Sequence, residues 1–287
     1  MKDKRLLLAF PHPDDESFGP GGTIAKYARE GVDVHYVCAT RGEVGTVDPE
    51  MLKPYAHLPE DQRLGALRGQ ELRNAADILQ LTGLHYLGYR DSGMSGTESN
   101  RDPRAFINAD PERVTGQLVK ILRSVQPQVV VTFEPNGGYG HPDHIAIHRH
   151  TVAAFHAAAD PGRYPEQGPA WQAERLFYAA IPRSFFRRMR DEMAALGMDT
   201  SPFDRFAEGG GRGWPDDQVN VAMDVSATVE EKWDGLNCHR TQFGPSNLFR
   251  RLPEPMVKQM MSVEHFALAW PEPEPGLRLA DLFAGIE

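Results

Sequence analysis

The 287-residue chain lacks the features that mark secreted, membrane-spanning and nucleic-acid-binding proteins. Its only cysteines, Cys38 and Cys238, exclude a disulfide framework. A formal net charge of −9 disfavours nucleic acid as a partner, because displacing counterions from phosphates requires basic patches. No apolar run approaches the ~18 residues of a membrane span, and no small-residue cleavage site follows the short apolar stretch after MKDKR. We therefore expect a cytoplasmic globular protein without stable membrane insertion.

Strand-like and helical patterns alternate along the chain. Arg5–Phe10 is a continuous apolar run, which is typical of a strand buried on both faces of a parallel sheet. A helix over Thr23–Glu30 and a strand over Val32–Thr40 complete a βαβ unit. The alternation continues with helices at Leu67–Leu81, Pro111–Val125 and His141–Ala159, and with strands at Leu84–Gly88, Gln128–Phe133 and Arg175–Ile181. This order predicts an α/β fold: a doubly wound, mostly parallel, Rossmann-like sheet with helices on both faces.

Three long connections interrupt this order, at residues 42–62, 92–110 and 201–220. Long connections in a compact domain usually form functional rims or lids. The alternation weakens from about residue 185, although FALAW near the end has the composition of a late strand. We therefore expect residues 1–184 to form a catalytic domain and residues 185–287 a small C-terminal cap packed on it.

Two polar clusters follow predicted core strands. HPDDE, residues 12–16, follows the first strand, and GGYGHPDH, residues 137–144, follows the strand at Gln128–Phe133. Open α/β sheets bind ligands at the carboxyl ends of their strands, so both clusters are expected to meet at one edge. Imidazole and carboxylate groups suit zinc or a related divalent ion. His12, one aspartate of the first cluster and one histidine of the second would supply three ligands, leaving the second aspartate to accept a proton from water.

Each cluster alone also fits a structural role. His-Pro-Asp is common in turns, and Glu16 at a helix start complements the helix dipole. His144 and His148 have a chelating spacing that also arises by chance in a histidine-rich stretch. The glycines of FGPGG lack the G-x-G-x-x-G spacing of a nucleotide-binding loop. The joint placement of the two clusters after core strands favours the metal site.

The two clusters together resemble the LmbE/PIG-L superfamily of zinc-dependent N-deacetylases. That superfamily includes N-acetylglucosaminyl-phosphatidylinositol deacetylases, deacetylases of the mycothiol and bacillithiol pathways, and mycothiol conjugate amidases. The similarity is carried by AFPHPDDESFGPGG through ATRGEVG and by GGYGHPDHIAIH, and it resumes weakly at KWDGLNCHRTQ. One departure is Pro11, where the family usually has alanine; the residues that would bind the ion are unchanged.

The resemblance implies a role for each matching residue. His12, Asp15 and His144 would bind zinc, or ferrous iron in its place. Asp14 would be the general base on the metal-bound water. His141 would stabilise the oxyanion or protonate the leaving amine, with Asp143 orienting it, and Tyr139 would help to bind the carbonyl oxygen. Substrate contacts on weaker motifs are implied for Arg68 and Asp91, and His239 would line the pocket from the cap or be an ordinary histidine of a cap helix.

The resemblance thus implies a metal-dependent hydrolase that removes an acetyl group from an N-acetylglucosamine-type small molecule. Three alternatives remain: an amidase acting on a larger thiol-sugar conjugate, an iron oxygenase using the two-histidine, one-carboxylate ligand set, and a silent sugar-binding module. The sequence leaves open the exact sugar, the native metal, the general acid and whether the chain forms a homo-oligomer.

Overall fold

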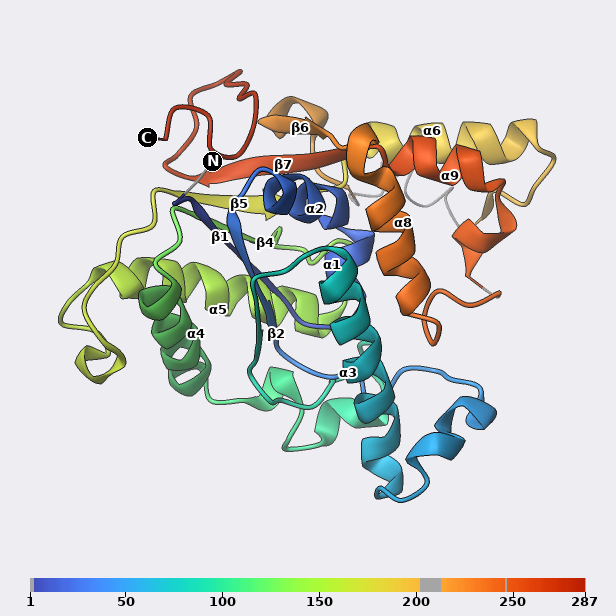
Figure 1. Ribbon diagram of the computed structural model, residues 1–287, viewed down its shortest axis with the longest axis horizontal. Coiled ribbons are helices and arrows are strands. Elements are labelled where there is room, and N and C mark those ends of the chain that lie inside the picture. Colours follow the sequence, from blue (N-terminus) through green and yellow to red (C-terminus); the bar gives the residue numbers. More distant parts are fainter. Residues whose placement is uncertain (1–2, 202–212, 246, 287) are drawn as a thin grey trace.

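The computed structural model describes residues 3–201, 213–245 and 247–286, and in these residues a seven-stranded sheet has the order β3-β2-β1-β4-β5-β7-β6 (Figure 1). The first five strands are parallel, whereas β7 runs antiparallel to β5 and β6 antiparallel to β7. This confirms the predicted doubly wound, mostly parallel fold. The strands are β1 (Arg5–Phe10), β2 (Asp33–Cys38), β3 (Gly83–Tyr86), β4 (Val129–Phe133), β5 (Arg175–Ala179), β6 (Val221–Asp224) and β7 (Val263–Trp270).

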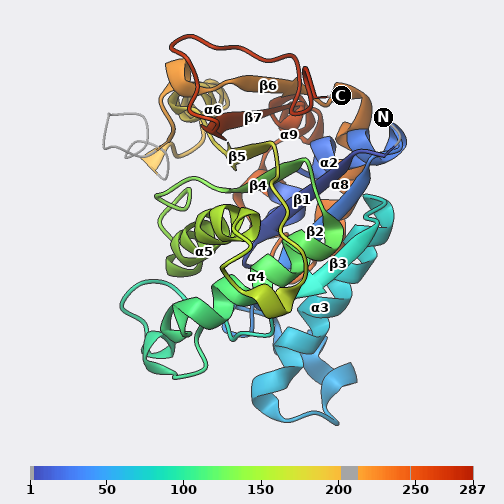
Figure 2. The same ribbon diagram turned by 90° about the vertical axis from the view of Figure 1, so that its left-hand side faces the viewer.

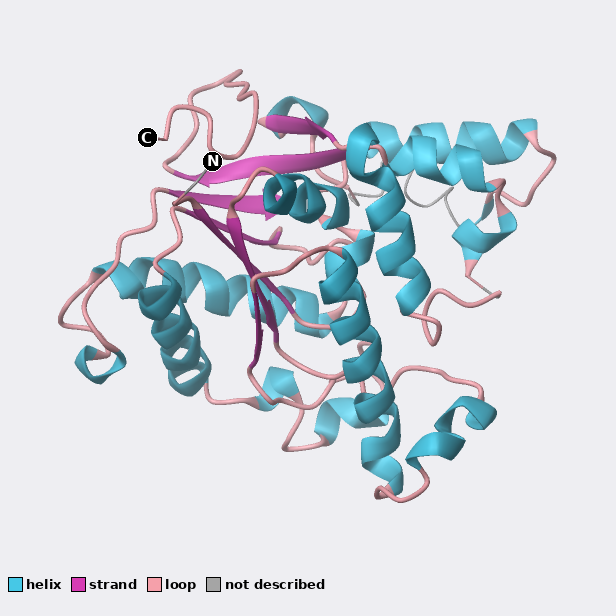
Figure 3. Ribbon diagram, in the orientation of Figure 1, coloured by secondary structure: helices cyan, strands magenta, loops and turns pink. Residues whose placement is uncertain are grey.

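Helices cover both faces of the sheet, as the sandwich of layers in Figure 3 shows. Successive side chains of a strand point to opposite faces, so the apolar run of β1 supplies both cores. Leu6 and Leu8 pack toward α2 (Gly21–Arg29) and α3 (Glu60–Ile78), whereas Leu7 packs toward the helices of the other face. Those helices are α4 (Pro111–Val125) and α5 (Pro142–Ala159). None of the helices in the described ranges is long and apolar enough to cross a membrane.

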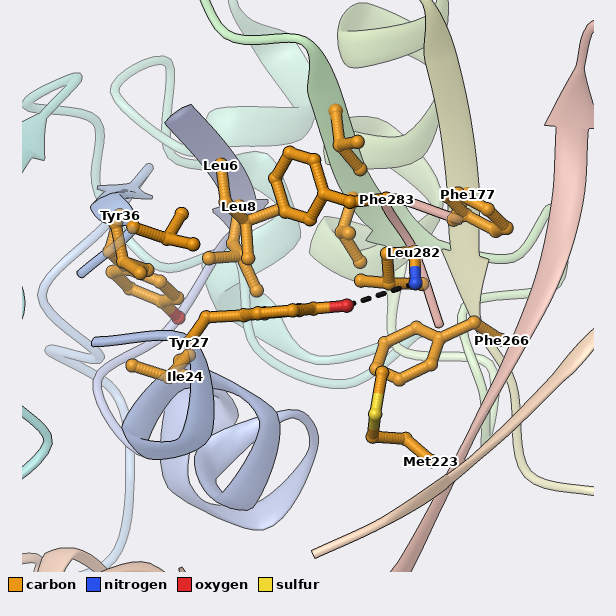
Figure 4. Packing of buried hydrophobic residues seen from close by; sticks show 14 of the residues in the cluster. Leu6, Leu8, Ile24, Tyr27, Tyr36, Phe177, Met223, Phe266, Leu282 and Phe283 are labelled. Atoms are coloured by element: carbon orange, nitrogen blue, oxygen red, sulfur yellow. Dashed lines mark hydrogen bonds between the residues drawn. The ribbon is translucent and has the colours of Figure 1, made fainter. Parts of the chain in front are cut away.

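The C-terminal part, which was predicted to be a cap, contributes two strands to the sheet. Its strands β6 and β7 extend the sheet beyond β5. Its last residues return to the main core, where the Leu282 N–H donates to the Tyr27 hydroxyl at 2.9 Å (Figure 4), and both chain ends lie together (Figure 2). A separate apolar cluster joins three further helices, which are α6 (Arg183–Ala195), α8 (Val229–Cys238) and α9 (Glu254–Met261).

The long connections are partly structured. The first contains a 3-10 helix at Pro49–Tyr55 and ends inside α3, which begins at Glu60. The second contains 3-10 turns at Glu98–Arg101 and Phe106–Asn108. Of the third, residues 202–212 lie outside the described residues.

A buried ion pair ties the C-terminal part to the first βα unit. The Glu264 carboxylate accepts hydrogen bonds from the N–H groups of Gly22 and Thr23, both at 2.8 Å, at the start of α2. These N–H groups have no partner within the helix, and the helix dipole favours a negative charge beside them. Lys232 of α8 completes the cluster, with its Nζ 2.6 Å from Glu264 Oε1. Glycine is required at position 22, since a Cβ there would lie 2.5 Å from Val225 Cγ2.

We expect Lys232→Met to lower the free energy of unfolding by about 3 kcal/mol, because it leaves the Glu264 carboxylate buried without its cation. Urea unfolding at neutral pH measures this change. The control is Lys53→Met, which removes one partner of an exposed ion pair with Glu50 and should change stability little. Equal stability of the Lys232→Met and wild-type proteins would contradict the prediction.

Candidate metal-dependent active site

The two polar clusters meet at the carboxyl edge of the sheet. Strands β1 and β4 are parallel neighbours, with Ala9 opposite Thr132, so the loops that follow them leave the sheet side by side. His12 lies in the first of these loops, and His144 lies in the first turn of α5. The two imidazoles face each other, with His12 Nδ1 3.3 Å from His144 Nε2.

The spacing of His12, Asp15 and His144 fits a shared ion. Asp15 Oδ2 lies 3.6 Å from His12 Nδ1, and Asp15 Oδ1 lies 3.6 Å from His144 Nε2. Tetrahedral coordination with bonds of about 2.0–2.1 Å separates ligand atoms by about 3.3 Å, which the His12–His144 pair matches, while Asp15 turns a different oxygen to each imidazole. All three side chains are buried. When one ligand atom is taken from each described residue, two groupings have all their atoms within 4.8 Å of one another, and Asp15 belongs to neither: His12, His141 and His144, and His12, Asp91, His141 and Asp143.

The second nitrogen of His12 is held by carboxylates. Its Nε2 lies 3.2 Å from Asp143 Oδ2 and 3.6 Å from Asp91 Oδ1. Burial alone would lower the pKa of His12, but these two carboxylates raise it well above its usual range. The Asp143 carboxylate therefore contacts His12 rather than the His141 ring, and it also accepts a hydrogen bond from the Ser92 N–H at 2.9 Å. A carboxylate on the outer nitrogen fixes the orientation of a metal-binding imidazole.

His141 caps α5 and is aligned by that helix. Its Nδ1 accepts a hydrogen bond of 3.1 Å from the Asp143 backbone N–H. In a neutral ring the proton must then be on Nε2, which makes this atom a donor. Burial and the nearby His12 lower the pKa of His141 to about 4, so the ring is neutral at physiological pH.

Asp14 has an unusual backbone conformation and an arginine partner. Its φ is 122°, in a region that residues with side chains rarely adopt and that is enriched at functional sites. Arg68 Nη2 lies 3.4 Å from Asp14 Oδ2 and donates to the Pro13 carbonyl at 2.7 Å. Burial raises the pKa of Asp14, although the Arg68 charge opposes this shift. Gly42, whose carbonyl accepts from Arg68 Nη1, has no room for a side chain, because a Cβ would lie 2.0 Å from that nitrogen.

The residues predicted to contact substrate differ in how far their side chains are exposed. Arg68 and Asp91 are buried beside Asp14 and His12, respectively. Tyr139 is 47% exposed, and its ring centroid lies 4.9 Å from that of His144. Arg68 and Asp91 thus form the wall next to the predicted metal ligands, while Tyr139 lies at the open side.

His239 differs from both of the roles that the sequence suggested. It is 0% exposed, so it neither lines an opening nor faces solvent. Its Nε2 lies 2.5 Å from Glu16 Oε1, and Glu16 is also 0% exposed. Burial would raise the pKa of Glu16 and lower that of His239, but each group opposes this effect in the other, so the pKa of Glu16 is lowered and that of His239 is raised. The sequence did not predict this pair, because the helix dipole already accounted for an acidic residue such as Glu16 at the start of a helix.

The fold and this site define a class: α/β proteins in which carboxylates and a pair of imidazoles at a strand edge can hold a metal ion. Residues 7–155, just over half of the chain, match the family model PIG-L, described as GlcNAc-PI de-N-acetylase. The chain belongs to this family and is a hydrolase acting on linear amide C–N bonds.

Comparisons over the full chain agree with this assignment. A curated relative from Thermobifida fusca, named 1D-myo-inositol 2-acetamido-2-deoxy-alpha-D-glucopyranoside deacetylase, is 41% identical over 285 residues, 96% of each chain. Among solved structures, N,N'-diacetylchitobiose deacetylase from Pyrococcus horikoshii has a TM-score of 0.64 at 22% identity, covering 95% of this chain and 84% of its own. The hydratase GalB from Pseudomonas putida has a TM-score of 0.59 at 18% identity, covering 96% and 99%.

The fold likeness alone does not decide the reaction, since a hydratase shares it. The curated deacetylases decide it, and they do not support the iron oxygenase alternative. The residues at the sheet edge can hold one metal ion.

Proposed function

We propose that this protein removes the acetyl group from 1D-myo-inositol 2-acetamido-2-deoxy-α-D-glucopyranoside, the substrate in the name of its 41%-identical relative. The observation that carries the proposal is the pairwise spacing of 3.3–3.6 Å among His12, Asp15 and His144, with Asp14 next to them. A small amino-sugar amide fits a site whose walls are charged and hydrogen-bonding rather than apolar.

In the proposed mechanism His12, Asp15 and His144 would hold zinc. When bound, zinc would supply Lewis-acid polarisation of the acetamide carbonyl and lower the pKa of a water molecule toward ~7. Asp14 would accept the proton of the attacking water, with Arg68 holding its carboxylate from 3.4 Å away. His141 donates its Nε2–H to the oxygen on which negative charge develops, because its Nδ1 already accepts from the helix.

Tyr139 lies on the open side, where its hydroxyl assists His141 in binding the carbonyl oxygen. Asp14 then passes its proton to the departing amine, since the neutral His141 is committed as a hydrogen-bond donor. Asp143 and Asp91 hold His12 in place, and Arg68 and Asp91 border the bound sugar. Ferrous iron is the alternative occupant of the same ligands.

An acetate- and amine-release assay on three substrates tests this function. The substrates are the N-acetylglucosaminyl-inositol, plain N-acetylglucosamine and a bulky thiol-sugar conjugate, each with added zinc or ferrous iron. We expect the highest kcat/KM on the N-acetylglucosaminyl-inositol with zinc. Failure to deacetylate any N-acetylglucosamine derivative would rule the proposal out.

The conjugate amidase remains a second candidate because the structure has room near the site. A groove of about 420 Å³ is lined by Glu43 and other residues of the first long connection, by residues of α3, by residues 88–90 and by Arg104. The Asp91 N–H donates to Glu43 at 3.0 Å, which joins this groove to the site wall. A higher kcat/KM on the bulky conjugate would favour the amidase. A cytoplasmic location stays a prediction from the sequence.

We expect zinc affinity to fall as the pH is lowered from 8 to 6. Burial raises the pKa of Asp15 to about 8 in the metal-free protein, although His12 opposes this shift. Below pH 8 the ion must therefore displace a proton, which weakens binding by about tenfold per pH unit for each proton released. A chelator-competition titration at pH 6, 7 and 8 measures this slope, and an affinity independent of pH would contradict it.

A further inference from the structure

The buried Glu16 carboxylate connects two distant parts of the chain. Its Oε2 accepts the Asp14 backbone N–H at 3.0 Å. Its Oε1 accepts the Ser17 hydroxyl at 2.6 Å and faces His239 Nε2 at 2.5 Å. Residues 16 and 239 are 223 positions apart in sequence, so the contact is made by folding rather than by local structure. A carboxylate with no solvent exposure needs such a partner to stay charged.

Asp14 depends on this carboxylate for its conformation. A φ of 122° is unfavourable for a residue with a side chain, and persists only when its surroundings hold it. The Asp14 carbonyl is held by the N–H groups of Ser17 and Phe18, at 3.0 and 2.9 Å. Its N–H is held by Glu16. The direction in which the Asp14 side chain leaves the backbone is therefore set partly by where the Glu16 carboxylate lies.

His239 is in turn fixed by the helix that precedes it. Helix α8 packs closely on α1 (Asp15–Phe18), where a Cβ at Gly235 would lie 3.0 Å from the Ser17 hydroxyl. Just after His239, the Thr241 N–H and hydroxyl both donate to Glu71 of α3, at 3.0 and 2.6 Å. The segment carrying His239 is thus clamped against both α1 and α3.

We propose that His239 is a positioning residue for catalysis, which acts through Glu16 to hold Asp14 in the conformation that presents its carboxylate to the substrate. The C-terminal segment is then part of the catalytic apparatus, although it lies outside residues 7–155 that match the family model. This inference rests on the proposed role of Asp14 as the base.

Three substitutions of His239 test the inference. Leucine removes the hydrogen bond to Glu16, glutamine places an amide nitrogen near the position of Nε2, and asparagine carries the same amide one carbon short of it. We expect kcat to fall about 10- to 100-fold in the leucine and asparagine variants, the effect typical of residues that orient active-site groups through hydrogen bonds. In the glutamine variant kcat should recover most of the wild-type value. KM and zinc content at saturating zinc should stay near the wild-type values.

The control is Val119→Ala in α4, which creates a cavity in the apolar core on the opposite face of the sheet from α3 and α2. It should lower the melting temperature without changing kcat. The inference would be overturned by a wild-type kcat in His239→Leu or by equal kcat values in the glutamine and asparagine variants. If the leucine variant does not fold, the comparison of the glutamine and asparagine variants still tests the inference. Wild-type enzyme that releases no acetate would instead contradict the proposed function.

Discussion

Asp14→Asn should keep its zinc and lose turnover by about 10²–10⁴-fold, the contribution of a well-placed general base. Asparagine has the shape of aspartate and is among the residues that tolerate positive φ, so the backbone at 122° is preserved. Its amide cannot accept the proton of the attacking water. Initial rates of amine release, together with metal analysis of the same samples, measure both parts of the expectation.

A matched control for this variant is Asp33→Asn, which makes the same chemical change at an exposed position at the start of β2. It should retain full activity. If Asp14→Asn turned over at the wild-type rate, Asp14 would not be the base. If it lost its zinc, Asp14 would belong among the metal ligands.

Asp15→Ala should abolish both stoichiometric metal binding and activity. Its carboxylate oxygens lie 3.6 Å from the ligand nitrogens of His12 and His144, so alanine leaves two ligands where catalytic zinc uses three. The metal-free fold should lose little stability, because removal of a buried carboxyl whose pKa is raised to about 8 offsets the loss of its hydrogen bond from the His12 N–H at 2.8 Å.

Thermal melts with and without zinc separate loss of metal from loss of fold. An ion at 100 times its Kd stabilises the wild-type protein by about 2.7 kcal/mol, which raises its melting temperature. We expect no such rise in Asp15→Ala, with a metal-free melting temperature close to that of the wild type. Retention of one zinc per chain in this variant would show that His141 or Asp91 supplies the third ligand instead.

Much of the fold follows from local patterns. Helix α4 has its predicted bounds, because Asp110 caps it by accepting from the Glu112 N–H and Pro111 occupies its first position. Helix α3 begins at Glu60 rather than at the predicted Leu67. Its first residues, 60–62, are exposed and carry no apolar periodicity, so the sequence pattern does not reveal them as helical. The four residues of β6 were not predicted, because so short a strand leaves little pattern and is stabilised by pairing with β7.

The sequence predicted which strand ends carry the site residues, but it did not predict the hydrogen-bond partners of their side chains. Parallel neighbours bring His12 and His144 together, and this follows from the order of elements. Whether the Asp143 carboxylate reaches His141 or His12 depends on how α5 is rotated about its axis, which spacing does not specify. The Glu16–His239 pair joins residues 223 positions apart, and no local pattern reports such a contact.

The buried Glu264–Lys232 ion pair at the start of α2 affects how the chain folds during its synthesis. The carboxylate that completes the first turn of this helix comes from residue 264, 242 positions later, and its lysine partner from residue 232. During synthesis the N-terminal half can collapse early. The Glu264 carboxylate can bind the start of α2 only when nearly the whole polypeptide has left the ribosome. Contacts of such long sequence separation slow folding, so the final step toward the native state is expected to be the arrival of β7.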